Sequence, residues 1–172
     1  MGIYLQSIKY DEELLRDVLA LDAALYPRSF QGTTLTVKPR FEAYPEMFIY
    51  RYESENNLIG YICFFPVSHE LEEKIKNSPL LYDDNITGKD IVNRPNNPYL
   101  VISIAVNKKY QRKKVATNLM QVVISKLQTK ARPLTIYAYT INHESDKLFK
   151  KFSFKTSKKI SDTIRLQYLK LN

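Results

Sequence analysis

The pattern of apolar and polar positions predicts strands and helices that alternate around a buried centre. The most apolar run, Tyr99–Val106, is rich in β-branched residues and is typical of a strand buried on both faces. The clearest helix is Val115–Lys130, where apolar and polar residues fall on opposite stripes. Leu134–Thr140 reads as the next strand. A strand, a helix and a strand in this order normally give two parallel strands joined by a crossover.

Further elements are predicted on both sides of this centre. The expected strands are Ile3–Ile8, Met47–Glu53, Leu58–Phe65, Ser153–Ile160 and Thr163–Leu171, with hairpin turns at 54–57 and 161–162. The expected helices run from caps at Asp11, Ser68 and Asn142 to about Leu25, Asn77 and Lys151. Pro27, Gly32 and Pro39 indicate a loop or short helices, and Asn77–Pro98 is expected to be irregular. The prediction is one domain, 1–172, with a mixed sheet of the α/β or α+β class.

Composition narrows the function classes. Apolar residues make up 44% and charged residues 26% of the chain, as in ordinary globular proteins. The single cysteine, Cys63, excludes an intramolecular disulfide and a cysteine-rich metal site. No uncharged apolar run is long enough to cross a bilayer, and acids from Asp11 onward interrupt any targeting stretch. We therefore expect a cytoplasmic protein with no membrane partner.

Charge is distributed unevenly along the chain. Residues 1–106 hold 10 basic and 15 acidic side chains, whereas residues 107–172 hold 16 basic and 3 acidic ones. The stretch 107–132 contains no acid at all. This asymmetry favours an anionic partner for the C-terminal half, such as a nucleic acid, a membrane surface or a polyphosphate cofactor.

A basic turn separates the buried strand from the clearest helix. Residues 107–116 read Asn-Lys-Lys-Tyr-Gln-Arg-Lys-Lys-Val-Ala. A helix N-terminus presents unpaired N–H groups and the positive end of the helix dipole, and both attract phosphate oxygens. The turn is therefore either a phosphate site or a solvated basic loop.

Two blocks of the sequence resemble the GNAT superfamily of acetyltransferases. In the first, Ile104-Ala105-Val106 ends the buried strand, and Gln111–Ala116 stands at the family's Gln/Arg-x-x-Gly-x-Gly/Ala. The second family block is Asn-x-x-Ala-x-x-Leu-Tyr-x-Lys-x-Gly-Phe. The residues at its positions are Asn142, Ser145, Leu148, Phe149, Lys151, Ser153 and Phe154. The two blocks follow the family's order and cover about residues 99–155.

The resemblance implies a fold, a co-substrate and a binding site. The fold is a central mixed, largely antiparallel sheet of about seven strands, with about four flanking helices and splayed parallel strands at its centre. The co-substrate is acetyl-CoA or another acyl-CoA, with its pyrophosphate on the N–H groups of Gln111–Ala116 and its pantetheine beside Ile104–Val106. The residues implied to bind it are Ile104, Ala105, Val106, Gln111, Arg112, Lys113, Lys114, Val115, Ala116, Thr117, Asn142, Ser145, Phe149 and Lys151. No metal is implied.

Three residues depart from the family pattern. Lys114 replaces a glycine. A lysine is tolerated there if the residue has the negative φ of a helix start, but it is disfavoured if φ is positive. Ser153 replaces a second glycine, and we expect only a modest change in packing there. Phe149 replaces the tyrosine that many members use as a general acid toward the leaving thiolate. A thiol pKa near ~8.5 makes coenzyme A a tolerable leaving group without that acid.

The catalytic base is not evident from the sequence. An alkyl amine with a pKa of about 10.4 must lose a proton before it attacks, yet Tyr99–Val106 carries no acid. The candidate catalytic residues are Glu70, Asp90, Tyr99 and Ser103, with Asp83, Asp84 and Tyr26 as further possibilities. Each also has an ordinary reading, as a solvated loop acid, a packed aromatic or a core hydroxyl. His69 and His143 fit no metal spacing.

Three functional hypotheses follow. The first is an acyltransferase that moves an acetyl group from acetyl-CoA to a primary amine of a small molecule or peptide, by direct attack in a ternary complex. The second is a non-catalytic acyl-CoA-binding module, suggested by Phe149 and the acid-free strand. A nucleic-acid binder is disfavoured, because Tyr110 is the one aromatic residue within 107–132. The acceptor amine is not encoded in a motif, and exposed strand edges leave a homodimer open.

Overall fold

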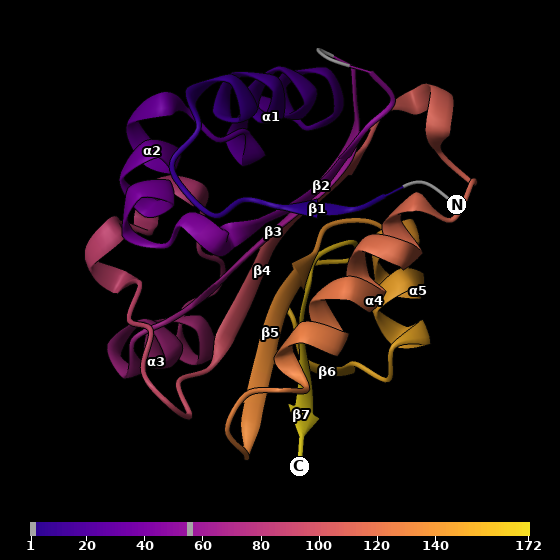
Figure 1. Ribbon diagram of the computed structural model, residues 1–172. Coiled ribbons are helices and arrows are strands. Elements are labelled where there is room, and N and C mark those ends of the chain that lie inside the picture. Colours follow the sequence, from indigo (N-terminus) through magenta and orange to yellow (C-terminus); the bar gives the residue numbers. More distant parts are fainter. Residues whose placement is uncertain (1–2, 55–56) are drawn as a thin grey trace.

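The computed structural model describes residues 3–54 and 57–172. Across these ranges seven strands form one sheet in the order β1-β2-β3-β4-β5-β7-β6 (Figure 1). The strands are β1 (Leu5–Gln6), β2 (Phe48–Tyr52), β3 (Leu58–Pro66), β4 (Tyr99–Val106), β5 (Leu134–Thr140), β6 (Lys155–Lys159) and β7 (Arg165–Leu171). Only β4 and β5 pair in parallel, which confirms the predicted largely antiparallel mixed sheet. The predicted turn at 54–57 includes residues 55 and 56, which lie outside the described residues.

In the described ranges five α-helices flank the sheet, one more than the sequence suggests. They are α1 (Glu12–Leu25), α2 (Thr34–Ala43), α3 (His69–Asn77), α4 (Val115–Leu127) and α5 (His143–Lys151). The additional helix is α2, which begins at Thr33 with reciprocal side-chain and backbone bonds to Thr36 and contains Pro39. Proline at this position removes one helical hydrogen bond, to the carbonyl of Leu35. Because Leu35 is exposed, water can solvate that carbonyl, and the helix continues through the proline.

Helices cover both faces of the β1–β4 half of the sheet. Figure 1 shows α1 and α2 on one side of β2–β4 and α4 on the other. Every residue of β3 is buried between them. Edge-to-face aromatic contacts extend from α2 through β2 to β3, with ring centroids 4.9 Å apart for Phe41 and Phe48 and 5.7 Å apart for Phe48 and Tyr61. This core fixes α1 against the middle of β3 and β4.

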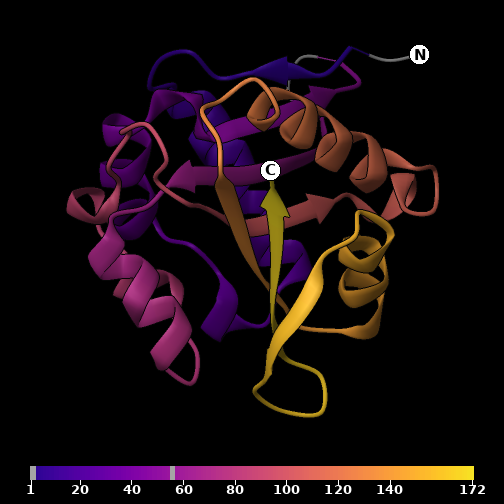
Figure 2. The same ribbon diagram turned by 90° about the horizontal axis from the view of Figure 1, so that it is seen from below.

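The two central strands separate soon after they pair. Tyr99, Leu100 and Val101 of β4 pair with Ile136–Ala138 in the middle of β5, and no pair follows along the rest of β4. Cys63 pairs with Ser103 and Phe64 with Val101, so one additional residue, Ile102, forms a β-bulge on β4. Beyond the bulge β4 runs toward the start of α4, while β5 runs toward α5 (Figure 2). The predicted splay of the parallel strands is therefore present.

The irregular segment between α3 and β4 is fixed by a buried ion pair. It contains two short 3₁₀ turns, Asp83–Asn85 and Gly88–Asp90. Arg40 of α2, which is 1% exposed, donates to the Asp83 carboxylate at 2.6 Å and to the Asp83 carbonyl at 3.3 Å. The Thr36 hydroxyl donates to the other carboxylate oxygen at 2.6 Å. These contacts hold residues 80–83 beside β4.

Replacing Arg40 by methionine should destabilise the fold. Arg40→Met leaves the Asp83 carboxylate without its cation in a mostly buried place, which should lower the free energy of unfolding by about 3 kcal/mol. Lys38→Met is the control, because it removes the same charge from an exposed pair with Glu42 and should cost less than about 1 kcal/mol. Urea denaturation of both variants measures the difference. Equal small losses would contradict a structural role for the buried pair.

Candidate functional site

A cleft of about 730 Å³ opens where β4 and β5 separate. Its floor is the second half of β4, from Val101 to Val106. One wall comes from the end of α1, Phe30 and residues 80–83, and the other from the start of α5. The turn at 110–114 and the first residues of α4 close one end. The volume is in the range of small-molecule binding sites.

The turn that leads into α4 has an unusual backbone. Arg112 has φ 61° and Lys114 has φ 63°, both in the left-handed region, and Lys114 is the N-cap of α4. Of the two backbone conformations left open for Lys114, the structure therefore has the positive φ, which favours glycine. Alternating left-handed residues direct successive N–H groups toward a common point and make anion-binding concavities.

The start of α4 adds unpaired donors to this concavity. Within the described part of the chain no side chain caps α4, and the first helical bond recorded is from the Asn118 N–H to the Lys114 carbonyl. Val115, Ala116 and Thr117, whose N–H groups precede that bond, are among the residues that line the cleft. The cleft end therefore combines helix donors with the cations Arg112 and Lys114.

The floor of the cleft is an unpaired strand edge. The Asn107 N–H donates to Ile59, so by the alternation of an antiparallel ladder Ile104 and Val106 turn their backbone groups toward the gap. The Ile104 carbonyl accepts from the Tyr26 hydroxyl, and the Val106 carbonyl accepts from Gln111 Nε2 at 3.1 Å. β5 does not pair with either residue, so their N–H groups face the cleft without a hydrogen bond to a neighbouring strand.

The opposite wall is built by the capping of α5. The Asn142 side chain accepts from the Ser145 N–H at 2.8 Å, and Ser145 Oγ accepts from the Asn142 N–H at 3.3 Å. Phe149, one turn further, is buried and packs edge-to-face against Phe154 with centroids 4.9 Å apart. Ser153 has φ 65°, so the expectation of only a packing change is wrong there: the residue adopts the left-handed backbone that favours glycine after a helix.

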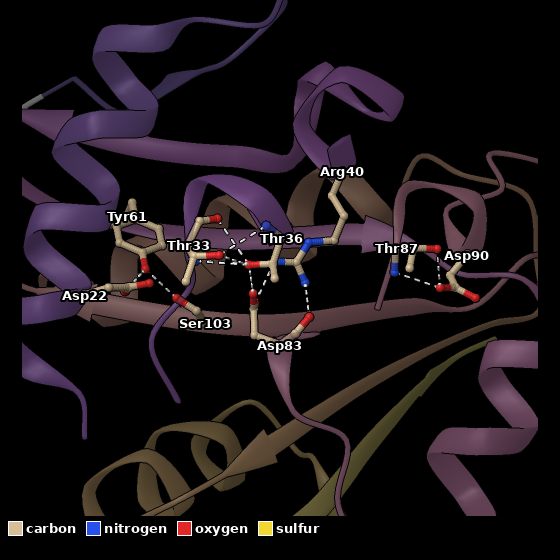
Figure 3. A network of polar contacts seen from close by, with 9 residues as sticks. All are labelled: Asp22, Thr33, Thr36, Arg40, Tyr61, Asp83, Thr87, Asp90 and Ser103. Atoms are coloured by element: carbon tan, nitrogen blue, oxygen red, sulfur yellow. Dashed lines mark hydrogen bonds and ion pairs between the residues drawn. The ribbon is translucent and has the colours of Figure 1, made fainter. Parts of the chain in front are cut away.

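A chain of hydrogen-bonded polar groups connects α1 to β4, which forms the floor of the cleft (Figure 3). The Asp22 carboxylate on α1 accepts a hydrogen bond from the Tyr61 hydroxyl of β3, and Tyr61 Oη lies 2.6 Å from Ser103 Oγ of β4. Asp22 is 5% exposed. Burial raises the pKa of the Asp22 carboxyl to about 6, against the hydrogen bonds from Tyr61 and the Gly32 N–H, which lower it.

Comparison with known proteins identifies the family. The model of the acetyltransferase (GNAT) family matches residues 15–154. The chain belongs to the GNAT acetyltransferase family. No protein with a curated description matches it significantly.

Solved structures confirm the GNAT fold at low sequence identity. A chain of the NatC complex bound to Gag peptide and CoA is 16% identical over 100% of both chains, with a TM-score of 0.71. Arabidopsis thaliana Naa50 with the bisubstrate analogue CoA-Ac-MVNAL is 12% identical over 98% of this chain and 99% of its own, with a TM-score of 0.67. The ribosomal-protein-S18-alanine N-acetyltransferase of Escherichia coli is 12% identical over 99% and 94%, with a TM-score of 0.61.

Most residues implied by the GNAT resemblance to bind the co-substrate line one cleft. Those that line it are Ile104, Ala105, Val106, Gln111, Arg112, Lys114, Val115, Ala116, Thr117, Asn142, Ser145 and Phe149. Lys113 and Lys151 are not among the lining residues, and Lys113 instead lies over the Tyr110 ring at 5.2 Å from its centroid. The two sequence blocks thus meet in space.

The four candidate catalytic residues are scattered. Ser103 lines the cleft. Glu70 is exposed on α3 and pairs with Lys74 at 3.2 Å, and Asp90 accepts bonds from the Thr87 N–H and hydroxyl at 2.8 and 2.9 Å. Tyr99 is buried at the opposite end of β4.

Within the described ranges, no group of three or more His, Cys, Asp or Glu side chains could hold a metal ion.

Sequence reasoning missed the importance of Asp22 and Tyr61. Asp22 falls on the apolar stripe of α1, between Leu21 and Leu25. Because carboxylates are rarely buried, its position on this stripe was the sequence signal for a functional role. Tyr61 lies within a continuous apolar strand, where nothing distinguishes its hydroxyl.

In the described part of the chain no helix is long and apolar enough to span a membrane.

Asp22→Asn should change how stability depends on pH. The Asp22 pKa rises from an ordinary 3.8 to about 6 on folding, so the folded state binds the extra proton and loses stability as pH rises through this window. The cost above pH 6 is about 3 kcal/mol. An asparagine does not ionise, so the variant should gain about that much relative to the unaltered protein between pH 4 and pH 7. Urea denaturation at both pH values measures it, and a pH-independent difference would contradict it.

Proposed function

We propose that this GNAT-family protein transfers an acetyl group from acetyl-CoA to a primary amine of a small molecule or peptide, by direct attack in a ternary complex. The observation that carries the proposal is one cleft in which a cationic helix N-terminus and an unpaired strand edge adjoin a buried carboxylate. These three features match the three parts of such a complex: a diphosphate, an amide-containing arm and an amine.

The end of the cleft at α4 suits a diphosphate. Val115, Ala116 and Thr117, whose N–H groups have no helical partner, line it together with Arg112 and Lys114. Backbone donors and the helix dipole stabilise negative charge at fixed positions, and the side chains add charge-assisted hydrogen bonds. The residues present therefore fit the pyrophosphate of coenzyme A.

The edge of β4 suits the pantetheine arm. Its two amides can add to the backbone groups of Ile104 and Val106 as a further strand would. A carbonyl has two lone pairs, so the existing bonds from Tyr26 and Gln111 leave one acceptor position on each. A main-chain N–H of this edge would stabilise the oxyanion that forms on the thioester carbonyl.

Phe149 bears on the leaving group. It lines the cleft, is 3% exposed and has no hydroxyl to protonate a thiolate. A positioned general acid contributes roughly 10²–10⁴-fold, so its absence slows the reaction without preventing it. A thiolate with a conjugate pKa near ~8.5 departs without assistance at neutral pH.

Charge reversal at Arg112 should weaken co-substrate binding. Acetyl-CoA and desulfo-CoA should both raise the melting temperature of the unaltered protein, and Arg112→Glu should weaken their binding about tenfold or more, because it places a carboxylate beside the diphosphate. Arg132→Glu is the matched control: it makes the same charge change outside the cleft, in the loop between α4 and β5. Calorimetric titration measures both. Equal weakening would indicate a general charge effect, and no heat with either ligand would refute the proposal.

Thiol release distinguishes catalysis from binding alone. Peptides with a free α-amine, polyamines, aminoglycosides and amino acids serve as acceptors, and a thiol reagent detects coenzyme A. Cys63 is buried and its thiol pKa is raised by burial, so it should not react appreciably in this assay. At least one class of amine should release thiol at a rate that depends on acceptor concentration. Binding of acetyl-CoA without release from any acceptor would favour the non-catalytic module.

A further inference from the structure

A buried carboxylate is connected to the floor of the cleft through two hydroxyl groups. Asp22, Tyr61 and Ser103 come from α1, β3 and β4, and Asp22 and Ser103 both line the cleft. Figure 3 shows these three side chains and the hydrogen bonds between them. Resting on the proposed acetyl transfer, we propose that these three side chains form a relay that takes the proton from the acceptor amine and delivers it to Asp22.

The hydrogen bonds have one consistent direction. The single proton of Tyr61 is donated to Asp22 Oδ1. Tyr61 Oη and Ser103 Oγ are 2.6 Å apart, so the Ser103 hydroxyl must be the donor of that bond. The Ser103 oxygen then keeps lone pairs for a donor in the cleft. An ammonium group is such a donor, and the cleft beside Ser103 is where the thioester end of the co-substrate would lie.

Other charged groups around Asp22 leave it available as a base. Arg40 and Asp83 face it from α2 and residues 80–83, but they are paired with each other at 2.6 Å. Tyr26 at the end of α1 and Cys63 of β3 also face it, and burial raises the pKa of both side chains, so they stay neutral at pH 7. The Gly32 N–H and Tyr61 complete the surroundings. Asp22 with a pKa of about 6 is ionised at neutral pH and a stronger base than an ordinary aspartate.

The proton movement balances in three transfers. An N–H bond of the ammonium breaks as its proton passes to Ser103 Oγ, the Ser103 proton passes to Tyr61 Oη, and the Tyr61 proton passes to Asp22 Oδ1. Both hydroxyls end neutral, and Asp22 becomes a carboxylic acid. The freed nitrogen lone pair forms the C–N bond, and the C–S electron pair leaves on sulfur. The nitrogen then gives its surplus proton to the thiolate, and Asp22 later returns its own to water.

Two other acids of the cleft fit the role less well. Asp83 is held by Arg40 and Thr36 at 2.6 Å each. Glu144 lies exposed in the first turn of α5 and has no hydrogen-bond chain to β4 among the contacts recorded for the described residues. Glu144→Gln therefore tests the main alternative base.

The test is the pH dependence of kcat/KM for the unaltered protein, Asp22→Asn, Tyr61→Phe and Ser103→Ala. The acceptors are a short peptide with a free α-amine, of pKa about 8, and spermidine, whose primary amines have a pKa of about 10. The unaltered protein should show a limb near pH 6 with whichever of them it acetylates. Each variant should instead follow the pKa of that acceptor. Its loss should be about 10²-fold or more at pH 7 and should shrink as pH rises.

Two controls separate chemistry from structure. Asp17→Asn removes the same kind of bond on the same helix, since the Tyr52 hydroxyl donates to Asp17 at 2.7 Å away from the cleft, and it should leave the profile unchanged. A loss in Asp22→Asn that is equal at every pH, or a retained limb near pH 6, would overturn the relay, as would removal of that limb by Glu144→Gln. Absence of turnover by the unaltered protein would remove the proposed function and the relay together, whereas an active Asp22→Asn with an unchanged profile would remove the relay alone.

Discussion

The separation of β4 from β5 is the constraint on which the site depends. Paired strands satisfy one another's backbone groups, and after three paired positions these two strands no longer do so. The Ile104 and Val106 carbonyls are satisfied instead by the Tyr26 hydroxyl and the Gln111 amide, each from a segment next to the cleft. Both residues line the same cleft as the first residues of α4, whose N–H groups have no helical partner. One interruption of the sheet thus creates a row of backbone donors and the room for a ligand.

The turn into α4 carries strain at positions where glycine would be comfortable. A left-handed residue other than glycine costs roughly 1–2 kcal/mol, and both Arg112 and Lys114 adopt this conformation. A glycine at Lys114 would relieve the strain but would remove an ammonium group from the end of the cleft that suits a diphosphate. The lysine therefore costs backbone strain energy and adds a positive charge to the cleft. Ser153 adopts the same backbone conformation outside the cleft lining, and nothing in the structure explains its retention there.

The sequence predicts most of the fold, but it does not predict that Asp22 is connected to the cleft floor. Periodicity locates β3, β4, α4 and β5 within a few residues, because each carries an apolar face, and the Asn142 cap locates the start of α5. It places only a loop or short helices where α2 lies, because the penalty for Pro39 is decided by the exposure of Leu35, which is a tertiary property. The two sequence blocks locate the helix N-terminus from local order alone. The relation of Asp22 to Ser103 joins residues 81 positions apart through Tyr61, and no local pattern encodes it.

The uneven charge along the chain becomes a division of the cleft in space. Arg112 and Lys114, from the basic C-terminal half, occupy the end at α4, whereas Asp22 and Asp83, from the acidic N-terminal half, belong to the wall formed by α1 and residues 80–83. Because Arg40 neutralises Asp83, the negative charge on that wall is concentrated on Asp22. This distribution of charge favours a diphosphate at the α4 end and an ammonium group beside the α1 wall. Under the proposed acetyl transfer, the reacting carbonyl would lie between them, above the N–H groups of β4, which would stabilise the developing oxyanion.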